Sequence, residues 1–428
     1  MHRLNKVIVL YEKHQKVIIS MLAAILLTGG ICFSIFLGDN LKFADEKDYF
    51  RIANNLSTKH IYSIDGVNPT AFRSPGYPLI LYGILQLGGS IVTIRIFNYI
   101  ALSITLILIY KLLKKIGGAI SGGIGAFLIC FYPVLFFTAG MLYPQAVAIA
   151  LFILILYLLI KNIESDKFYY FLICGLLYGY LILIHPLFLL NLPVIISYPF
   201  LLGQKKKLIK AFIFFLSFLI VISFWVYRNF IIFHHFIPLT THSGLTFLYG
   251  NHEKALPTSY YAVVEYIKDN YEKEIKNMDE IQKNDFFYKK AISWITNNKK
   301  DAIKLYILKI INFFNYKVEL ITKQEESKLR DKVLFASYYP LLILFIYRIF
   351  CIKKYKPSKP ELFLIILFLT SPLLMSTFLI RIRLRLPYDI LMLAVDSLFI
   401  GKLLSCKYIF IRMPNSKVSV YKKNGNIL

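Results

Sequence analysis

Long apolar stretches separated by short, mostly basic connections make up most of the sequence. A helix that crosses a bilayer needs about 20 mainly apolar residues, because only a helix satisfies its own backbone groups where water is absent. Stretches of this kind occur at 17–37, 91–113, 118–137, 144–160, 168–184, 187–202, 208–227, 333–347, 362–380 and 387–404. The pattern therefore predicts an all-α polytopic membrane protein with about ten transmembrane helices.

Basic residues in the connections predict how these helices are oriented. Lysines and arginines gather before the first span, at Lys114 and Lys115, at 205–207, at 353–359 and in the C-terminal tail. Alternate connections are thus basic, and the positive-inside rule places them in the cytoplasm. We therefore expect cytoplasmic termini. The stretch 77–87 is too short to cross and is expected to form a re-entrant or interfacial helix.

This topology leaves two long hydrophilic segments on the outer side, at 38–75 and 228–332. Within the second, apolar residues recur at helical spacing over 285–296 and 301–314, which predicts two amphipathic helices that lie against the bilayer or cap the bundle. The expected division is an N-terminal transmembrane region, an extracytoplasmic helical segment and a C-terminal transmembrane region with a basic tail, at 1–227, 228–332 and 333–428.

Composition narrows the function classes. Of 428 residues, 57% are hydrophobic and 17% are charged, and the mean hydropathy is +0.60, which excludes an ordinary soluble enzyme and a disordered chain. The net charge of +26 would suggest nucleic acid in a soluble protein, but no nucleic-acid-binding fingerprint occurs. None of the five cysteines lies in the long hydrophilic segments. Without a glycine-rich phosphate loop, a nucleophile elbow or a cysteine-ligand pattern, neither a cofactor nor a metal is expected.

The first outer loop carries a pair of candidate catalytic carboxylates. Asp45 and Glu46 directly follow the first span. Asp45 has two compatible interpretations, as the cap of a helix or as a general base, since partial burial and nearby charge can tune a carboxylate at the bilayer surface. The residues that follow predict an amphipathic helix on the outer membrane surface, with one apolar face formed by Tyr49, Ile52, Ala53 and Leu56.

The sequence RSPGYP, at 73–78, sets a cation among turn-forming residues. The prolines stiffen the turn and the glycine allows close backbone approach, so Arg73 is expected to be held in place. Two interpretations of Arg73 remain equal at this point, namely a binding role and an anchor to lipid phosphate.

An arginine cluster precedes the last span. Arg381, Arg383 and Arg385 alternate in RIRLR on the outer side, against the positive-inside trend. Guanidinium groups match phosphate bidentately, so the cluster suits a lipid-linked phosphate or diphosphate, and headgroup contact is the alternative. Extended backbone would aim all three side chains similarly. Asp389 shares a helix face with Asp396, and suits a structural hydrogen bond or a functional role.

Four histidines lie in the second outer segment, in HHFIPLTTHSGLTFLYGNH. His234, His235, His242 and His252 match no compact zinc signature, so they are more typical of a polar loop. Metal binding by these residues stays the alternative.

The order of these features resembles a known family. The chain is similar to bacterial membrane glycosyltransferases of the GT-C fold in five successive features. These are an acidic pair after the first span, a surface helix, R-x-P-G-Y-P at 73–78, W-x-x-R-N at 225–229 and R-x-R-x-P-x-D at 383–389. The resemblance is to the group of protein O-mannosyltransferases and the aminoarabinose transferase of lipid A, glycosyltransferase family 39-like, and it covers nearly the whole chain.

The resemblance implies an enzyme that transfers a hexosyl or pentosyl unit, with inversion, from a polyprenyl-phosphate donor to an acceptor hydroxyl. It implies Asp45 as the base, with Glu46 its neighbour, and Arg383 and Arg385 as holders of the donor phosphate. Further candidates for phosphate binding are Arg73, Arg228 and Arg381.

Two positions depart from the family pattern. Gln145 stands where many relatives carry glutamate, and His185 precedes a proline where they often carry arginine. Both are expected at outer helix ends, where they could alter donor or acceptor preference. Together with Tyr77 and Asp389, they are candidates for the donor or acceptor pocket.

The resemblance also implies partners and a location. The partners are a polyprenyl-phosphate-linked sugar, a lipid, glycan or protein acceptor, and membrane lipids, without nucleic acid. The location is the bacterial cytoplasmic membrane, with the active site on the outer face. A lipid or sugar transporter and an envelope polysaccharide polymerase or ligase are the alternatives. The mostly charge-free spans, with distinctive residues at their outer ends, disfavour a transporter. The acidic pair with its surface helix favours the glycosyltransferase over the polymerase or ligase.

Overall fold

The computed structural model describes residues 2–257, 261–317 and 327–412, and every regular element in these ranges is helical, which confirms the predicted all-α class. The N-terminal half contains α1 (His2–Leu37), α2 (Ala44–Lys59), α3 (Gly76–Gln86), α4 (Ile91–Cys130), α5 (Pro133–Ala139), α6 (Gln145–Ser165), α7 (Tyr169–Ile184), η1 (Pro186–Asn191), α8 (Leu192–Ile196) and α9 (Tyr198–Leu201). The remainder contains α10 (Lys207–Phe233), α11 (Ser243–Gly250), α12 (Tyr261–Ile275), α13 (Glu280–Asn297), α14 (Lys299–Phe313), α15 (Lys328–Phe350), α16 (Lys359–Met375) and α17 (Ile382–Arg412).

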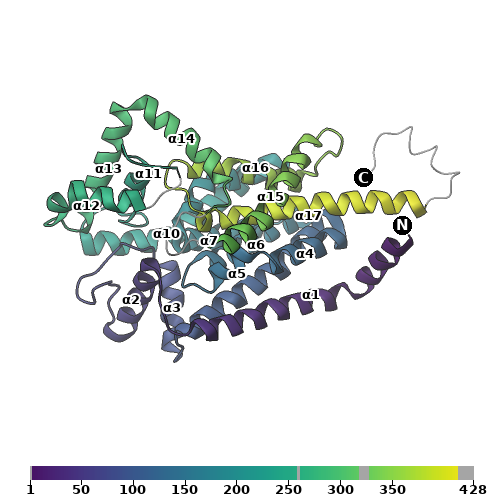
Figure 1. Ribbon diagram of the computed structural model, residues 1–428, viewed down its shortest axis with the longest axis horizontal. Coiled ribbons are helices and arrows are strands. Elements are labelled where there is room, and N and C mark those ends of the chain that lie inside the picture. Colours follow the sequence, from purple (N-terminus) through teal and green to yellow (C-terminus); the bar gives the residue numbers. More distant parts are fainter. Residues whose placement is uncertain (1, 258–260, 318–326, 413–428) are drawn as a thin grey trace.

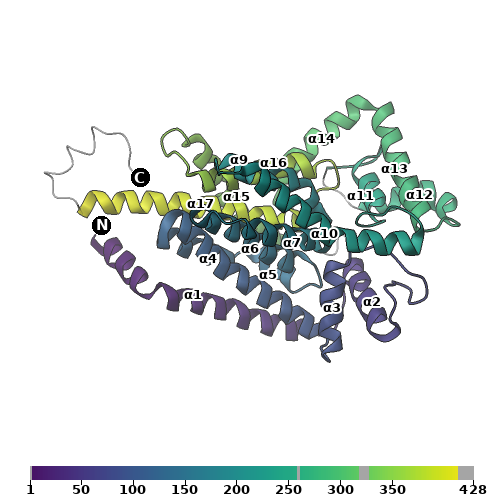
Figure 2. The same cartoon turned by 180° about the vertical axis from the view of Figure 1, so that it is seen from behind.

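The long helices run lengthwise through one bundle. α1 packs against α4, α4 against α6 and α17, and α7 against α10. The start of α1 and the end of α17 lie at one end of this bundle, whereas α2, α3 and α11 to α14 gather at the other (Figures 1 and 2). The bundle thus separates α2 and α11 to α14 from the start of α1 and the end of α17.

Five helices in the described part of the chain are long and apolar enough to cross a membrane. They cover Val9–Leu37, Ile91–Cys130, Gln145–Ser165, Lys207–Phe233 and Lys328–Phe350. The chain is therefore a multi-pass membrane protein, while the number ten stays a prediction. The predicted division of the chain also stays a prediction, and α10 continues past its first boundary to Phe233.

α4 contains the predicted span 91–113 and most of the span 118–137, folded into a hairpin. Gly118 has φ 87° and ψ 176°, which interrupts the helix. A Cβ added to Gly122 would lie 2.8 Å from the backbone oxygen of Tyr110, and one added to Gly125 would lie 2.4 Å from the side chain of Leu113. In a straight helix, residues 12 apart are separated by about 18 Å. The chain therefore reverses at Gly118, and the arms pack closely through glycine.

The predicted span 187–202 is wrong as a single helix. The chain forms η1, α8 and α9 in succession, each with a proline at its first or second position. Pro186, Pro193 and Pro199 lack the N–H that continues the ladder of an existing helix, but fit the first turn of a new one. Hydropathy alone does not predict this division, because all three short helices are apolar.

The predicted short helices are present. α2 buries Ile52 and Ala53 fully, with Tyr49 and Leu56 packed against the same core. α3, of 11 residues, corresponds to the stretch that is too short to cross. The two amphipathic helices predicted within 228–332 are α13 and α14.

A buried lysine attaches α14 to the bundle. Lys309 is 2% exposed, and its Nζ donates to the backbone oxygens of Gly250 at 3.0 Å and Phe378 at 3.2 Å and to Oδ1 of Asn251 at 3.3 Å. The three partners are neutral. Burial therefore lowers the pKa of Lys309 to about 8. The contacts join α14 to the end of α11 and to the connection before α17.

Gly118→Ala is expected to destabilise the protein by about 1–3 kcal/mol, because this backbone region is essentially restricted to glycine. The matched control is Gly83→Ala, since Gly83 is helical and a Cβ there meets no atom within 4 Å. Thermal unfolding of the purified proteins in detergent measures both. Equal melting temperatures for the two variants would contradict the hairpin.

Lys309→Met is expected to remove a pH dependence of stability. Between pH 8 and 10.5, unfolded Lys309 binds a proton that the folded protein has released, so the wild type gains stability relative to the variant as pH rises, by about 1.4 kcal/mol per pH unit. Melting temperatures across this range test the sign. Lys304→Met, at an exposed position of α14, is the control, and a constant difference between wild type and Lys309→Met would refute the expectation.

Candidate active site

Glu46 fixes the start of α2. Its Oε2 accepts the backbone N–H groups of Lys42 at 3.1 Å and Phe43 at 3.0 Å, and its Oε1 accepts that of Leu142 at 2.9 Å. Nη1 of Arg95 lies 3.6 Å from Oε1, and both side chains are almost completely buried. The expectation that Asp45 caps the helix is wrong, because Phe43 is the cap residue and Asp45 lies inside the first turn of α2. Asp45 is left to face other groups.

Asp45 pairs with two arginines that come from distant parts of the chain. Nη2 of Arg73 lies 2.5 Å from Oδ1 of Asp45, and Nη2 of Arg383 pairs with Oδ2. Arg73 also binds Oδ2 of Asp48 at 2.8 Å. Two carboxylates thus balance two guanidinium groups at the end of the bundle that carries α2. The side chains of Asp45 and Arg383 are 23% and 24% exposed, so solutes can reach the pair.

Aromatic side chains and a backbone contact hold Arg73 in place. Its guanidinium lies 5.3 Å from the ring centre of Tyr49 and 5.1 Å from that of Phe72. The hydroxyl of Tyr62 donates to the backbone oxygen of Arg73 at 2.8 Å. The side chain is 11% exposed and is pre-organised against Asp45.

The arginines of RIRLR diverge. The backbone here is helical and not extended, because α17 begins at Ile382. Side chains two positions apart on a helix differ in direction by about 200°. Arg383 turns toward Asp45 and lies 4.6 Å from the ring centre of Tyr143. The backbone oxygen of Arg381 accepts the N–H of Arg385 at the first turn of the helix.

Arg385 joins α17 to the end of α14. It is 2% exposed, donates to the backbone oxygens of Phe313 and Asn315, and pairs with Asp389 at 2.9 Å. Its guanidinium lies 4.0 Å from the ring centre of Tyr338. Asp389 also accepts the hydroxyl of Tyr132 at 3.3 Å. These contacts engage Nε and Nη1 of Arg385, and none of them involves Asp45.

The arginines set the protonation state of Asp45. Burial favours the neutral acid, but the charges of Arg383 and Arg73 outweigh it and hold the pKa of Asp45 well below its usual range. Burial, together with the positive charge of Arg73, lowers the pKa of His242 to about 3. Near neutral pH the cluster therefore contains an ionised aspartate beside a neutral imidazole.

His242 is a neighbour of this cluster that the sequence did not reveal. Its ring centre lies 4.4 Å from that of Phe72, which in turn contacts Arg73. His252 instead stacks on Tyr266 at 4.2 Å. Among the described residues, no group of three or more histidine, cysteine, aspartate or glutamate side chains could hold a metal ion. Asp48 could have been recognised from its position one turn after Asp45, but no local signal marks His242.

The remaining predicted residues form two groups. Arg228 donates to the backbone oxygen of Thr70 at 2.9 Å and lies 4.9 Å from the Trp225 ring, so it supports the end of the first loop. Nε2 of Gln145 and Nε2 of His185 lie 3.4 Å apart, at the start of α6 and the end of α7.

Tyr77 belongs to the support of α2. It is fully buried, its hydroxyl is 3.1 Å from Nδ2 of Asn98, and its ring meets Tyr49 edge-on at 5.3 Å. It therefore packs beneath the helix that carries Asp45 and Asp48.

The cluster contains the groups needed to catalyse a nucleophilic substitution that expels an anionic leaving group. A carboxylate that is ionised at neutral pH can accept a proton from a hydroxyl, and guanidinium groups can bind a phosphate and stabilise the charge it gains. The exposure of Arg383 leaves it accessible to such an anion.

Comparison with known proteins identifies a partial family match and similar folds. Residues 72–227 match the family model of dolichyl-phosphate-mannose-protein mannosyltransferases. The search of curated proteins finds no match. The fold is similar to that of the apo Archaeoglobus fulgidus oligosaccharyltransferase, with a TM-score of 0.55 and 14% identity over 94% of this chain and 51% of that chain. The partial family match and the similar structure together confirm the predicted resemblance to the GT-C fold.

Two further structures are similar. AglB from Archaeoglobus fulgidus, in complex with an inhibitory peptide and a dolichol-phosphate, gives a TM-score of 0.50 and 13% identity over 95% of this chain and 52% of that chain. ArnT from Cupriavidus metallidurans, bound to undecaprenyl phosphate, gives a TM-score of 0.46 and 10% identity over 91% of this chain and 78% of that chain. The chain spans about half the length of the oligosaccharyltransferase.

Glu46→Ala is expected to lower the free energy of unfolding by about 3–5 kcal/mol, because it removes a buried carboxylate that binds backbone amides and faces the charge of Arg95. Asp39→Ala, at an exposed position of the same loop, is the matched control and is expected to be neutral. Melting temperatures in detergent report both changes. Unchanged stability of Glu46→Ala would show that Glu46 does not organise α2.

Proposed function

We propose that the chain is an integral-membrane glycosyltransferase that moves a sugar from a polyprenyl-phosphate donor to an acceptor hydroxyl. The observation that carries this proposal is the pairing of Asp45 with Arg73 and Arg383. The fold and the family match over 72–227 support it. The similar archaeal structure holds a dolichol-phosphate, which supports a polyprenyl phosphate as the donor class.

Arg383 is proposed as the principal ligand of the donor phosphate. Arg73 is held by a second carboxylate, Asp48, and by two aromatic rings, whereas Arg383 is more exposed and stacks on Tyr143 alone. An incoming phosphate competes with Asp45 for the N–H groups of Arg383. Arg73 is proposed to assist, and Arg385 to position α17 through its contacts with α14.

Donor binding also prepares the base. An aspartate whose pKa is held far down is a weak base, since proton transfer is most effective when the pKa lies near the working pH. When the phosphate engages Arg383, Asp45 loses part of the positive charge that lowered its pKa. Its basicity therefore rises once the donor is bound.

The transfer itself is a single displacement. The acceptor hydroxyl gives its proton to Asp45, and its oxygen forms a bond to the anomeric carbon. The bond between that carbon and the phosphate oxygen breaks, and the electron pair leaves with the polyprenyl phosphate, whose charge Arg383 stabilises. Attack opposite the leaving group inverts the configuration at the anomeric carbon.

The transfer is proposed to take place on the outer face of a bacterial cytoplasmic membrane, with both termini in the cytoplasm. The separation of α2 and α11 to α14 from the start of α1 supports this orientation (Figure 1). The acceptor is proposed to be an envelope glycan, a lipid or a protein. Gln145 and His185 are proposed to contribute to the substrate pocket, because they meet at an end of α6 and α7.

Asp45→Asn is expected to lower turnover by a factor of about 10²–10⁴, because the amide cannot accept the proton of the acceptor. Release of free polyprenyl phosphate by the purified protein in nanodiscs, offered a panel of polyprenyl-phosphate sugars and an envelope extract, measures turnover. Asp39→Asn is the control in the same loop. Wild-type turnover by folded Asp45→Asn would falsify the proposal.

A further inference from the structure

Two short strips of the chain lie side by side next to Asp45 and its arginines. The Arg73 strip comprises residues 70–73, and the His242 strip comprises residues 240–242. The backbone N–H of Thr241 donates to the backbone oxygen of Ala71 at 3.0 Å and joins the two strips. A shift of one strip is therefore passed to the other.

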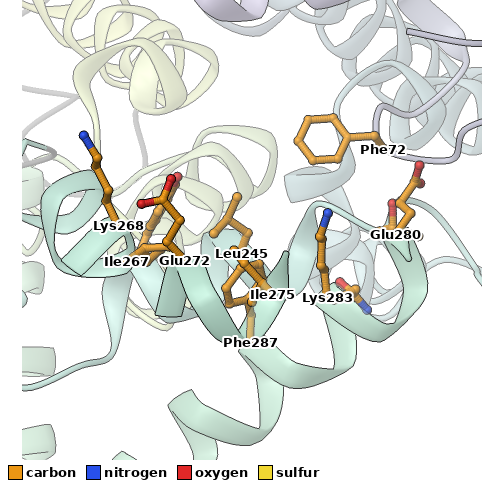
Figure 3. A pocket seen from close by; sticks show the side chains of 12 residues that line it. Phe72, Leu245, Ile267, Lys268, Glu272, Ile275, Glu280, Lys283 and Phe287 are labelled. Carbon is orange, nitrogen blue, oxygen red and sulfur yellow. The ribbon is translucent and has the colours of Figure 1, made fainter. Parts of the chain in front are cut away.

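Glu280, the first residue of α13, binds both strips with one carboxylate. Its Oε2 accepts the hydroxyl of Thr70 at 2.6 Å, and its Oε1 accepts the N–H of Ala71 at 2.9 Å and the hydroxyl of Thr241. Figure 3 shows Glu280 and Phe72, the residue before Arg73, on the same side of a cleft lined by α11, α12 and α13. One side chain of the outer segment thus fixes how the two strips lie.

The groups that Glu280 binds are removed from water. Thr70 and Thr241 are each 4% exposed, and Ala71 is fully buried. Hydrogen bonds to a carboxylate are stronger than those between neutral groups, and a buried donor without an acceptor is costly. Loss of Glu280 would leave three buried donors in need of another acceptor. The strips would have to shift to find one.

The Arg73 strip cannot shift without changing the site. Nη2 of Arg73 lies 2.5 Å from Oδ1 of Asp45 and 2.8 Å from Oδ2 of Asp48. Phe72 contacts both the guanidinium of Arg73 and the ring of His242. A displacement of about 1 Å in a group that acts on the reacting atoms can lower a rate by about 10²-fold.

We propose that Glu280 is a positioning residue for glycosyl transfer, which holds the two strips and thereby sets the placement of Arg73 against Asp45. The inference rests on the proposed function, in which Arg73 assists Arg383. The three hydrogen-bond partners of Glu280 are neutral groups. Its role therefore depends on the length of the side chain and its acceptor oxygens, and not on its charge.

Three substitutions of Glu280 separate length from charge. Glu280→Gln keeps the length and an acceptor oxygen, and is expected to retain a kcat close to that of the wild type. Glu280→Asp keeps the charge but is one methylene shorter, and is expected to lower kcat. Glu280→Ala is expected to lower kcat on the order of 10²-fold, measured as release of polyprenyl phosphate by the full chain in nanodiscs. A kcat as low in Glu280→Gln as in Glu280→Ala overturns the inference.

Asn284→Ala is the matched control for a general loss of stability. Oδ1 of Asn284, one turn further along α13, accepts the backbone N–H of Gly244 at 2.8 Å. This contact joins α13 to α11 without involving the Arg73 strip. The control is expected to lower the melting temperature and to leave kcat unchanged. Equal losses of kcat in Asn284→Ala and Glu280→Ala contradict a positioning role.

The acid limb of the pH profile of kcat is a readout that a loss of folded protein does not move. In the proposed function it reports the pKa of Asp45 in the donor complex. The charged and titratable groups around Asp45 are Arg73, Arg383, Asp48, His242, Tyr49 and Tyr143.

The charge of Arg73 lowers the pKa of Asp45, so displacement of Arg73 raises that pKa. The acid limb is therefore expected to move to higher pH in Glu280→Ala and to stay in place in Glu280→Gln. Fewer folded molecules would lower the whole profile without shifting it. An acid limb that Glu280→Ala leaves in place refutes the displacement of Arg73.

Thermal unfolding tests the attachment without any transfer. Arg73→Gln and Glu280→Ala are measured singly and together in the full chain. If Glu280 holds Arg73 against its two aspartates, the double variant loses less melting temperature than the sum of the two single losses. Additive losses overturn the inference.

The two measurements distinguish failure of the inference from failure of the proposed function. Non-additive losses, with no release from any donor by the wild type, support the placement of Arg73 by Glu280 and contradict the proposed function. Release by the wild type that Glu280→Ala leaves unchanged contradicts the inference and leaves the proposed function in place.

Discussion

The carboxylate of Asp45 joins three parts of the chain that are far apart in sequence, since it pairs with Arg73 after α2 and with Arg383 at the start of α17. A partly buried charge is costly unless it is paired, so each group requires the others in place. The negative charges of two aspartates balance the positive charges of two arginines. The cluster therefore assembles only when the first loop has docked on the last helix.

The adjacent acidic residues of this loop have different tasks. Glu46 points into the protein, where backbone amides occupy both of its oxygens, and Asp45 points to the accessible side. Because consecutive helical positions differ by about 100°, a fixed Glu46 also fixes the direction of Asp45. The rigid placement needed for proton transfer thus comes from the neighbouring side chain.

Hydrophobic periodicity was sufficient to predict the helical class, the short α3 and the amphipathic α2, because each depends on local sequence. It failed where distant contacts or local backbone chemistry determine the length of a helix or the direction of a side chain. Three prolines divide the stretch 187–202 without changing its hydropathy, and helical backbone at Ile382 separates Arg383 from Arg385. The proximity of His242 to Arg73 depends on the packing of Phe72, which no spacing along the chain encodes.

Glu280 binds the strip from Thr70 to Ala71 and also Thr241, so the start of α13 is attached to the loop that carries Arg73. Thermodynamic linkage gives this attachment a consequence for substrate order. If a ligand that contacts α13 favours one placement of the strip, and that placement changes the affinity of Arg73 and Arg383 for an anion, the effect is reciprocal. Each substrate then alters the affinity of the other by the same factor, and neither need bind first.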